Sequence, residues 1–343
     1  FEQQAWRASA DYDIGRTSHQ LAYSGSETER QAYTEGAPTF GSEGDRERWT
    51  YLGSVRGADW LRLVYGVDLL TESLDDGTFD RERDQDGYYL EYQGEFAGNL
   101  YLTAGARYDD NEDYGSHTTW RTSAAYVIPL SGGELKLRGT YGTGFRAPSL
   151  YEIAYNDGFF AFPPASETKL KEEESEGLDM GAAWYGANGL YLEAAYFDQQ
   201  IDDVIYFDLL GFSGSQQDEG EASSKGVELM AEWPLLDTQQ LAGNYTWTDS
   251  EDADGSSRPR RPEHLANLAL QWLPGNGDIT LALHLRLAHG AEETDGSELD
   301  DYEVVDLSAS WEVLHGLELY GRVENLFDED YQDCLLYTSP SPR

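Results

Sequence analysis

The chain has 343 residues, of which 65 are acidic and 23 are basic, and its formal net charge is −42. Binding to nucleic-acid phosphates requires clustered lysine and arginine side chains, so this balance excludes nucleic acid as a partner. The only cysteine is Cys334, which excludes a disulfide framework and a cysteine-ligated zinc site. No apolar run approaches the roughly 18 residues of a transmembrane helix.

Alternation of apolar and polar residues at period two recurs along the whole chain, and it predicts β-strands. In 279–287 the residues Ile279, Leu281, Leu283, Leu285 and Leu287 share one face, and polar residues occupy the other. In chain order the same pattern is visible in segments 60–69, 99–108, 118–128, 133–141, 265–272, 278–289 and 304–313. A soluble sandwich alternates too, so the pattern is necessary for a membrane barrel without being sufficient.

The connections between these segments alternate between short and long. Short turns are predicted near 56–59, 95–98, 130–133, 186–189, 234–239, 274–277 and 314–316. Long polar segments are predicted near 25–46, 71–86, 109–117, 147–170, 208–222, 249–260 and 289–301. This parity is typical of an outer-membrane barrel, which has short periplasmic turns and long external loops. We therefore predict an all-β fold, an antiparallel up-and-down transmembrane β-barrel with about sixteen strands in this chain.

Tryptophan placement agrees with the barrel prediction. Trp60, Trp184, Trp233, Trp272 and Trp311 all lie within a few residues of a short turn. An aromatic girdle at a membrane interface would occupy these positions.

Glycines in "RGTYGTGFRAPSLYEIAY" (138–155) raise the question of a phosphate-binding loop. That function requires a helix directly after the glycine turn. Pro148 and the absence of an evident 3.6-residue apolar period in the residues that follow favour a strand end that runs into a loop. We therefore expect these glycines to belong to a strand of the barrel wall rather than to a nucleotide-binding site. We also expect no helix in 147–170.

Several motifs in their order along the chain resemble the TonB-dependent outer-membrane receptors. They are "YGTGFRAPSLYEI" (141–153), "LKEEESEGLDMGA" (170–182), "YFDQQIDDVIYF" (196–207), "SSKGVELMAEW" (223–233) and "GRVENLFDEDYQ" (321–332). The resemblance covers 134–332 in register and the earlier residues more loosely. It is nearest to the cobalamin-receptor-like and siderophore-receptor branch.

This resemblance implies most of the expected organisation. Family members have a barrel of about 22 strands around an N-terminal plug domain, and a short N-terminal box engages TonB. We therefore expect 1–332 to be a partial, C-terminal barrel fragment without its plug, and 333–343, with the prolines of "CLLYTSPSPR", to be a non-native tail.

The function implied by the resemblance is active uptake of a metal-bearing nutrient, cobalamin or a ferric siderophore, with energy supplied by TonB. The expected location is the outer membrane of a Gram-negative bacterium. The expected partners are outer-membrane lipid, the TonB complex through the N-terminal part, and a metal-bearing small molecule. The protein is not expected to be an enzyme. The alternatives are a passive porin-type channel and an outer-membrane hydrolase that uses Ser123 or Ser308 with His284.

Three groups of candidate site residues follow from these patterns. The aromatic group lies in one external loop, where it either contacts ligand or packs on itself: Tyr151, Tyr155, Phe159, Phe160 and Phe162. The lumen-facing group is Arg138, Arg146, His284 and Arg286. Asp252 and Asp254 are weak calcium candidates, because their loop imitates an EF-hand but lacks its first ligand and its bidentate glutamate. No other cofactor is expected.

Overall fold

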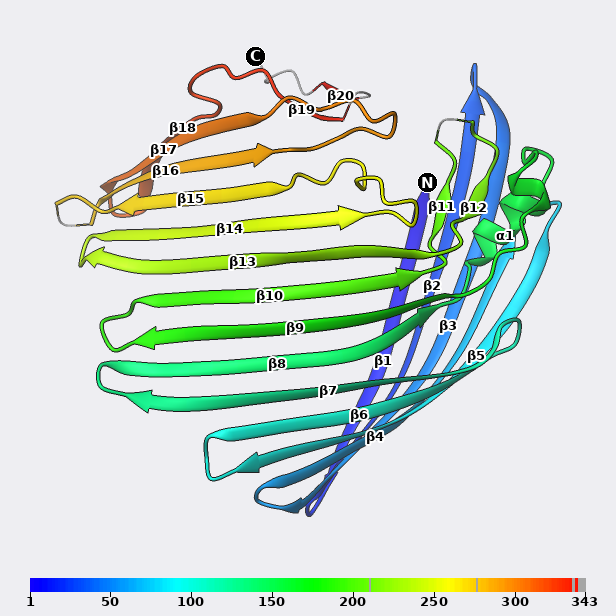
Figure 1. Cartoon of the computed structure of the whole chain (residues 1–343), viewed down its shortest axis with the longest axis horizontal. Helices are drawn as coiled ribbons and strands as arrows, with labels where there is room; N and C mark the ends of the chain where they lie inside the picture. Colours follow the sequence, from blue (N-terminus) through cyan, green and yellow to red (C-terminus); the bar gives the residue numbers. More distant parts are fainter. Residues whose placement is uncertain (210, 276, 335–336, 339–343) are drawn as a thin grey trace. The chain divides into compact units, whose positions relative to one another are not determined.

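The computed structural model describes residues 1–209, 211–275, 277–334 and 337–338. Within these residues it contains one antiparallel sheet of sixteen strands, which follow one another in chain order (Figure 1). The prediction of about sixteen strands in an up-and-down arrangement is thus confirmed. The strands of this sheet are β1 (Glu2–Ile14), β2 (Thr17–Thr34), β3 (Ala37–Ala58), β4 (Leu61–Asp75), β5 (Asp80–Phe96), β6 (Leu100–Asn111), β7 (Gly115–Leu130), β8 (Gly133–Arg146), β9 (Glu173–Gly186), β10 (Tyr191–Asp202), β13 (Glu221–Leu236), β14 (Gln239–Glu251), β15 (His264–Trp272), β16 (Ile279–His289), β17 (Tyr302–Leu314) and β18 (Leu317–Val323).

Shorter elements lie outside the sheet. They are α1 (Leu150–Asp157), the 3-10 helix η1 (Ala165–Glu167), the hairpin of β11 (Ile205–Phe207) and β12 (Ser215–Gln217), and the pair β19 (Gln332–Cys334) and β20 (Tyr337–Thr338). Residues 335–336 and 339–343 lie outside the described residues, so the non-native tail at 333–343 stays a prediction. Among the described residues, no helix is long and apolar enough to cross a membrane.

The predicted short turns are present within a few residues of their expected places. Connections of two to six residues lie at 59–60, 97–99, 131–132, 187–190, 237–238, 273–278 and 315–316. Long connections join β8 to β9, β10 to β13, β14 to β15 and β16 to β17. The alternation of short and long connections therefore holds in the later part of the chain.

The first three predicted long loops are wrong. Segments 25–46, 71–86 and 109–117 mostly continue the strands, and only 35–36, 76–79 and 112–114 form the connections. At the first of these turns Glu35 and Gly36 both have positive φ, 51° and 81°, which suits a tight two-residue hairpin. Polarity misled the prediction, because backbone hydrogen bonds pair polar strands in water as well as apolar strands in lipid.

Internal contacts divide the described chain into two units. Unit 1 contains Phe1–Ala124, Thr140–Gly177 and Ile201–Glu221, and unit 2 contains Ala125–Gly139, Leu178–Gln200 and the described residues from Ala222 onward.

In unit 2 the strand register places apolar residues together on one face. Leu268 lies opposite Leu285, which lies opposite Val305. Leu268, Trp272 and Trp311 remain 40%, 42% and 49% exposed. A sheet in water covers such a face with a second layer, whereas the outward face of a membrane barrel carries apolar residues without one.

Unit 1 has a polar face that is held together by buried charge. Asp68 on β4 is 5% exposed and accepts three hydrogen bonds, each 2.8 Å long, from Arg48, Thr50 and Arg107. Arg107 also donates to Asp109 on its own strand, at 2.8 to 3.0 Å. This network ties β3, β4 and β6 together through side chains as well as through the backbone ladder.

Candidate functional site

The loop that follows β8 contains a helix, which corrects the expectation of none in 147–170. The N-cap Ser149 accepts a hydrogen bond from the backbone N–H of Glu152, and the Glu152 side chain accepts one from the backbone N–H of Ser149. This reciprocal capping box starts α1. Leu150 and Ala154 then pack against Leu74. The signal was present in the sequence as Ser-Leu-Tyr-Glu, with apolar residues four apart.

The presence of α1 does not make this segment a nucleotide-binding site. A phosphate would have to reach the backbone N–H groups of the first turn. Here the Glu152 carboxylate already accepts from the N–H of Ser149 at 2.7 Å. The same carboxylate forms an ion pair with Arg146, whose Nη1 lies 3.1 Å from Oε2 of Glu152. The helix N-terminus is thus satisfied by its own chain, and the glycines of β8 belong to the wall.

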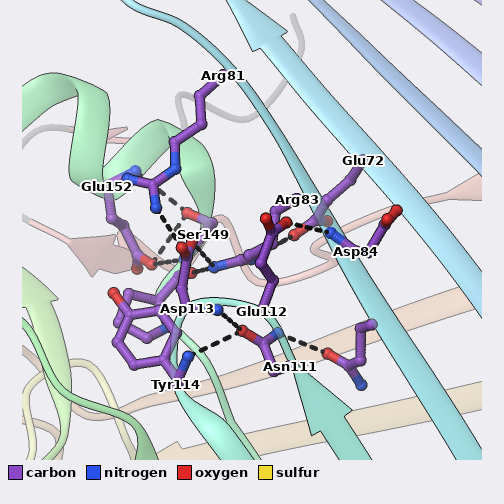
Figure 2. Close-up of polar contacts among 12 residues, drawn as sticks. Glu72, Arg81, Arg83, Asp84, Asn111, Glu112, Asp113, Tyr114, Ser149 and Glu152 are labelled. Carbon is purple, nitrogen blue, oxygen red and sulfur yellow. Dashed lines mark hydrogen bonds and ion pairs between the residues drawn. The ribbon is translucent and has the colours of Figure 1, made fainter.

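Arg83 anchors the start of this loop to the sheet (Figure 2). Its side chain is 5% exposed, and it hydrogen-bonds Glu72 on the neighbouring strand. Its Nη1 donates to the carbonyl of Pro148 at 2.8 Å and lies 3.8 Å from Oδ2 of Asp113. One buried guanidinium therefore connects two strands, a turn and the residue just before the helix cap. The sequence showed no signal for this role.

Next to this anchor, Asn111 closes the turn between β6 and β7 (Figure 2). Its side-chain oxygen accepts from the backbone N–H groups of Asp113 and Tyr114, at 3.1 and 3.2 Å. Arg81 bonds the Asp113 carboxylate from the other side. The turn that faces Arg83 is thereby held in one conformation.

Arg146, predicted to face a lumen, lies at the base of the loops. Its Nε and Nη2 bond both oxygens of Glu173 at 2.6 and 2.8 Å, and its Nη1 lies 3.1 Å from Glu152. Glu173 also accepts the backbone N–H of Ile205 at 2.7 Å. Arg146 therefore joins the end of β8 to both long loops that follow. This role is structural, and a lumen-facing role for Arg146 stays a prediction.

Two of the five predicted aromatic residues contact neighbouring elements: Tyr155 packs within the loops, and Tyr151 contacts β2. Tyr155 packs edge-on against Phe207, with ring centroids 5.1 Å apart. Tyr151 lies under the Arg30 guanidinium, 5.8 Å from its centre. For Tyr155 in particular, the self-packing alternative describes the observed contact.

The other three aromatic residues project into solvent. Phe159 is 94% exposed, Phe160 is 62% exposed and Phe162 is 48% exposed, and Phe159 and Phe160 touch only edge-on at 5.8 Å. Exposed rings in water cost free energy, which burial against a ligand would recover. Phe159, Phe160 and Phe162, which we name the exposed triad, are the part of the predicted group that is placed to contact a ligand.

The remaining lumen candidates lie on the polar face of unit 2. Arg138 bonds Glu193 through Nε at 3.2 Å and Nη2 at 2.6 Å. His284 lies opposite Asp306 in the strand register. Arg286 lies over the paired rings of Tyr302 and Tyr331, 5.5 and 5.4 Å from their centres, which are 4.8 Å apart. His284 and Arg286 line one cavity of about 650 Å³. That this face lines a lumen stays a prediction.

The calcium candidates are engaged with their own loop. Asp252 forms a 3.0 Å ion pair with Arg258, and Asp254 accepts from Ser256. Within the part of the chain that the structure describes, no group of three or more His, Cys, Asp or Glu side chains is placed to hold a metal ion. Calcium at these loops remains an untested proposal that no such cluster supports.

Asp254 supplies a test of loop electrostatics. The Ser256 hydroxyl at 2.6 Å and its backbone N–H at 2.9 Å hold the pKa of the Asp254 carboxyl below its usual range. A lowered folded-state pKa stabilises the loop above the usual aspartate range, and this contribution is lost as the pH falls through the lowered value. We expect Ser256→Ala to raise the pKa of Asp254, measured by carboxyl NMR titration. Asp295, which Ser297 holds in the same way, is the internal control.

The architecture defines a class of protein: an up-and-down antiparallel β-sheet whose strands alternate polar and apolar residues and whose later connections alternate between short and long. Residues 1–326 match the family described as TonB dependent receptor-like, beta-barrel. The chain belongs to this family, and the family predicted from the motifs is confirmed.

Curated relatives agree with this assignment. The vitamin B12 transporter BtuB of Vibrio cholerae serotype O1 is 29% identical over 294 residues, which are 83% of this chain and 43% of that protein. BtuB of Photobacterium profundum is 28% identical over 290 residues, 80% of this chain and 44% of that protein. The chain thus spans less than half the length of these relatives.

Solved structures show the same fold. The siderophore receptor PirA from Pseudomonas aeruginosa has a TM-score of 0.75 at 17% identity, covering 95% of this chain and 59% of that one. The copper transporter OprC has a TM-score of 0.74 at 18% identity, covering 96% and 61%. The ferric-catecholate import receptor Fiu from K12 E. coli has a TM-score of 0.71 at 17% identity, covering 97% and 60%.

Proposed function

We propose that this chain forms part of the barrel wall and the external loops of an outer-membrane active transporter of a Gram-negative bacterium. The transporter takes up cobalamin or a ferric siderophore with energy supplied through TonB. The observation that carries the proposal is membership of the receptor-barrel family over 1–326. The named functions of the relatives, vitamin B12 transport and siderophore reception, support these two substrate classes.

Within this function the exposed triad captures the ligand. The rings stand on a loop that Arg83 and Arg146 anchor to the sheet, so little conformational entropy is lost when a ligand orders them. The apolar face of the sheet contacts membrane lipid, TonB engages the N-terminal part of the receptor, and the chain performs no covalent chemistry.

The two alternatives make different demands. A passive channel would need no energy source, so a protonophore separates it from TonB-driven uptake. If uptake is active, the protonophore should stop accumulation of the ligand against its gradient.

A hydrolase would need an activated serine. Ser308 and His284 do line one cavity with Asp306. Among the described residues, however, no hydrogen bond joins these three side chains, and resistance to serine-directed labels is expected.

Replacing the exposed triad together with alanine is expected to weaken ligand capture at least tenfold. Each buried ring contributes about 1 to 3 kcal/mol when it packs against a ligand, and about 1.4 kcal/mol is a factor of ten in affinity. The measurement is equilibrium binding of cyanocobalamin and of a ferric catecholate to the full-length receptor in detergent. Tyr155 is left unchanged because it packs inside the loops.

Tyr33→Ala serves as the matched control, because Tyr33 is 66% exposed near the turn between β2 and β3. It should leave affinity unchanged. Equal affinity for both probes in a correctly folded triple variant would show that capture lies elsewhere and would remove the basis for this site.

A further inference from the structure

The connection between β10 and β13 packs against the loop that carries the exposed triad. We name 147–172 loop A and 203–220 loop B; both belong to unit 1. We propose that loops A and B form one capture module, in which Phe212 of loop B shares a binding surface with the exposed triad, and that the module takes an uncharged ligand with a flat apolar face. The proposal rests on the function proposed above.

Two side-chain amides hold the loops in register, one from each side. Asn156 of loop A donates to the carbonyl of Ser215 at 2.7 Å and accepts its N–H at 2.8 Å. Gln217 of loop B accepts the N–H of Lys171 at 2.8 Å and donates to its carbonyl at 3.0 Å. Each side-chain amide thus pairs with both the N–H and the carbonyl of one backbone residue, as a neighbouring β-strand would. Asn156 is only 7% exposed, so the loss of its bonds would leave buried polar groups unsatisfied.

Close packing completes the contact between the loops. Gly214 has a φ of 136°, and a Cβ there would lie 2.7 Å from Oδ1 of Asn156 and 2.9 Å from Cβ of Ala165. Ala165 is fully buried. The backbone N–H of Phe162 donates to the carbonyl of Ser213 at 3.2 Å. This last bond places Phe162 of the triad beside the residue that follows Phe212.

Phe212 itself is held in a costly conformation. Its φ of 56° lies in the left-handed region, which bulky residues rarely adopt. Asp208 holds the turn: its carbonyl accepts the N–H of Phe212 at 2.8 Å, and its carboxylate accepts the Ser213 hydroxyl at 2.7 Å. Although its ring touches Phe207, Phe212 is 61% exposed. Backbone strain that displays an aromatic ring is typical of a binding site.

The charge around the rings indicates the ligand class. Loops A and B together contain eight acidic residues and two basic ones, Lys169 and Lys171. Phe159, Phe160, Phe162 and Phe212 supply apolar area and no positive charge. An anionic ligand would be repelled on approach, whereas a neutral ligand with a flat face would recover the cost of exposing four rings.

The test measures cyanocobalamin binding to the full-length receptor, with a ferric catecholate as the anionic comparison. We expect Phe212→Ala to weaken cyanocobalamin binding about tenfold, as for a central interface ring, and Phe212→Tyr to retain affinity. Asn156→Leu, which removes both bonds to Ser215, should also weaken binding, because it displaces Phe212. In the Phe212→Ala background Asn156→Leu should have little further effect, and this coupling separates positioning from general destabilisation.

The outcomes distinguish this inference from the proposed function. Unchanged cyanocobalamin affinity in Phe212→Ala, with the exposed triad still required, would overturn the shared surface and leave triad capture standing. A loss confined to the ferric catecholate would overturn the neutral-ligand assignment. Additive effects of Asn156→Leu and Phe212→Ala would overturn the positioning role of Asn156. If the triad replacement itself has no effect, the proposed capture site fails first.

Discussion

Arg83→Ala should detach loop A from the sheet and lower local stability by about 3 to 5 kcal/mol, the range for breaking a buried ion pair on one side. The substitution leaves Glu72 without its main cation and the Pro148 carbonyl without its donor. The helix α1 would lose the fixed residue from which it starts. Hydrogen exchange is the measurement, and the amides of 150–157 should lose protection while those of β16 keep theirs.

Arg81→Ala is the matched control for this experiment. Arg81 is on the same strand and bonds the same Asp113, but its side chain is 41% exposed. An exposed pair contributes about 1 kcal/mol or less, so α1 should retain its protection. Unchanged protection in Arg83→Ala as well would contradict the anchoring role.

Asp68→Ala is expected to destabilise the sheet of unit 1 by about 3 kcal/mol, because two guanidinium groups and a hydroxyl lose their shared acceptor. Arg48 and Arg107 would then face each other's charge on the polar face, with only Asp109 remaining to offset Arg107. The measurement is the urea midpoint of the protein in detergent micelles, followed by tryptophan fluorescence.

The control removes a more exposed pair on the same face of unit 1. Glu91 bonds Arg121 at 2.5 Å, but the Arg121 side chain is 67% exposed. Glu91→Ala should therefore cost less than about 1 kcal/mol. If the two variants unfold at the same urea concentration, the Asp68 network has no special weight in the stability of the sheet.

The sheet was predictable because its signals are local. Alternation in segments such as 279–287 reports the two faces of a strand directly, since successive side chains point to opposite sides. Turn positions follow from glycine and polar clusters between the apolar runs. Polarity does not distinguish a loop from a strand at 25–46, because a hydrogen-bonded ladder in water needs no apolar face.

The helix α1 marks an intermediate case. Its capping box and its Leu150 to Ala154 spacing are visible in the sequence, whereas Pro148 and the glycines before it favour a strand end. Proline at that position restricts only the residue before it. Ser149 is therefore free to cap α1, and the capping box is a local signal for the helix despite the preceding proline.

Strand number, the two faces and the family were thus contained in the sequence, because each depends on neighbouring residues or on motif order. Only the tertiary structure decided three other features. They are the anchoring of loop A by Arg83, the packing of Tyr155 against Phe207 and the pairing of loops A and B. Asn156 meets Ser215 across 59 positions of the chain. No periodic pattern encodes such a contact, because it depends on where two strands end and how the loops between them pack.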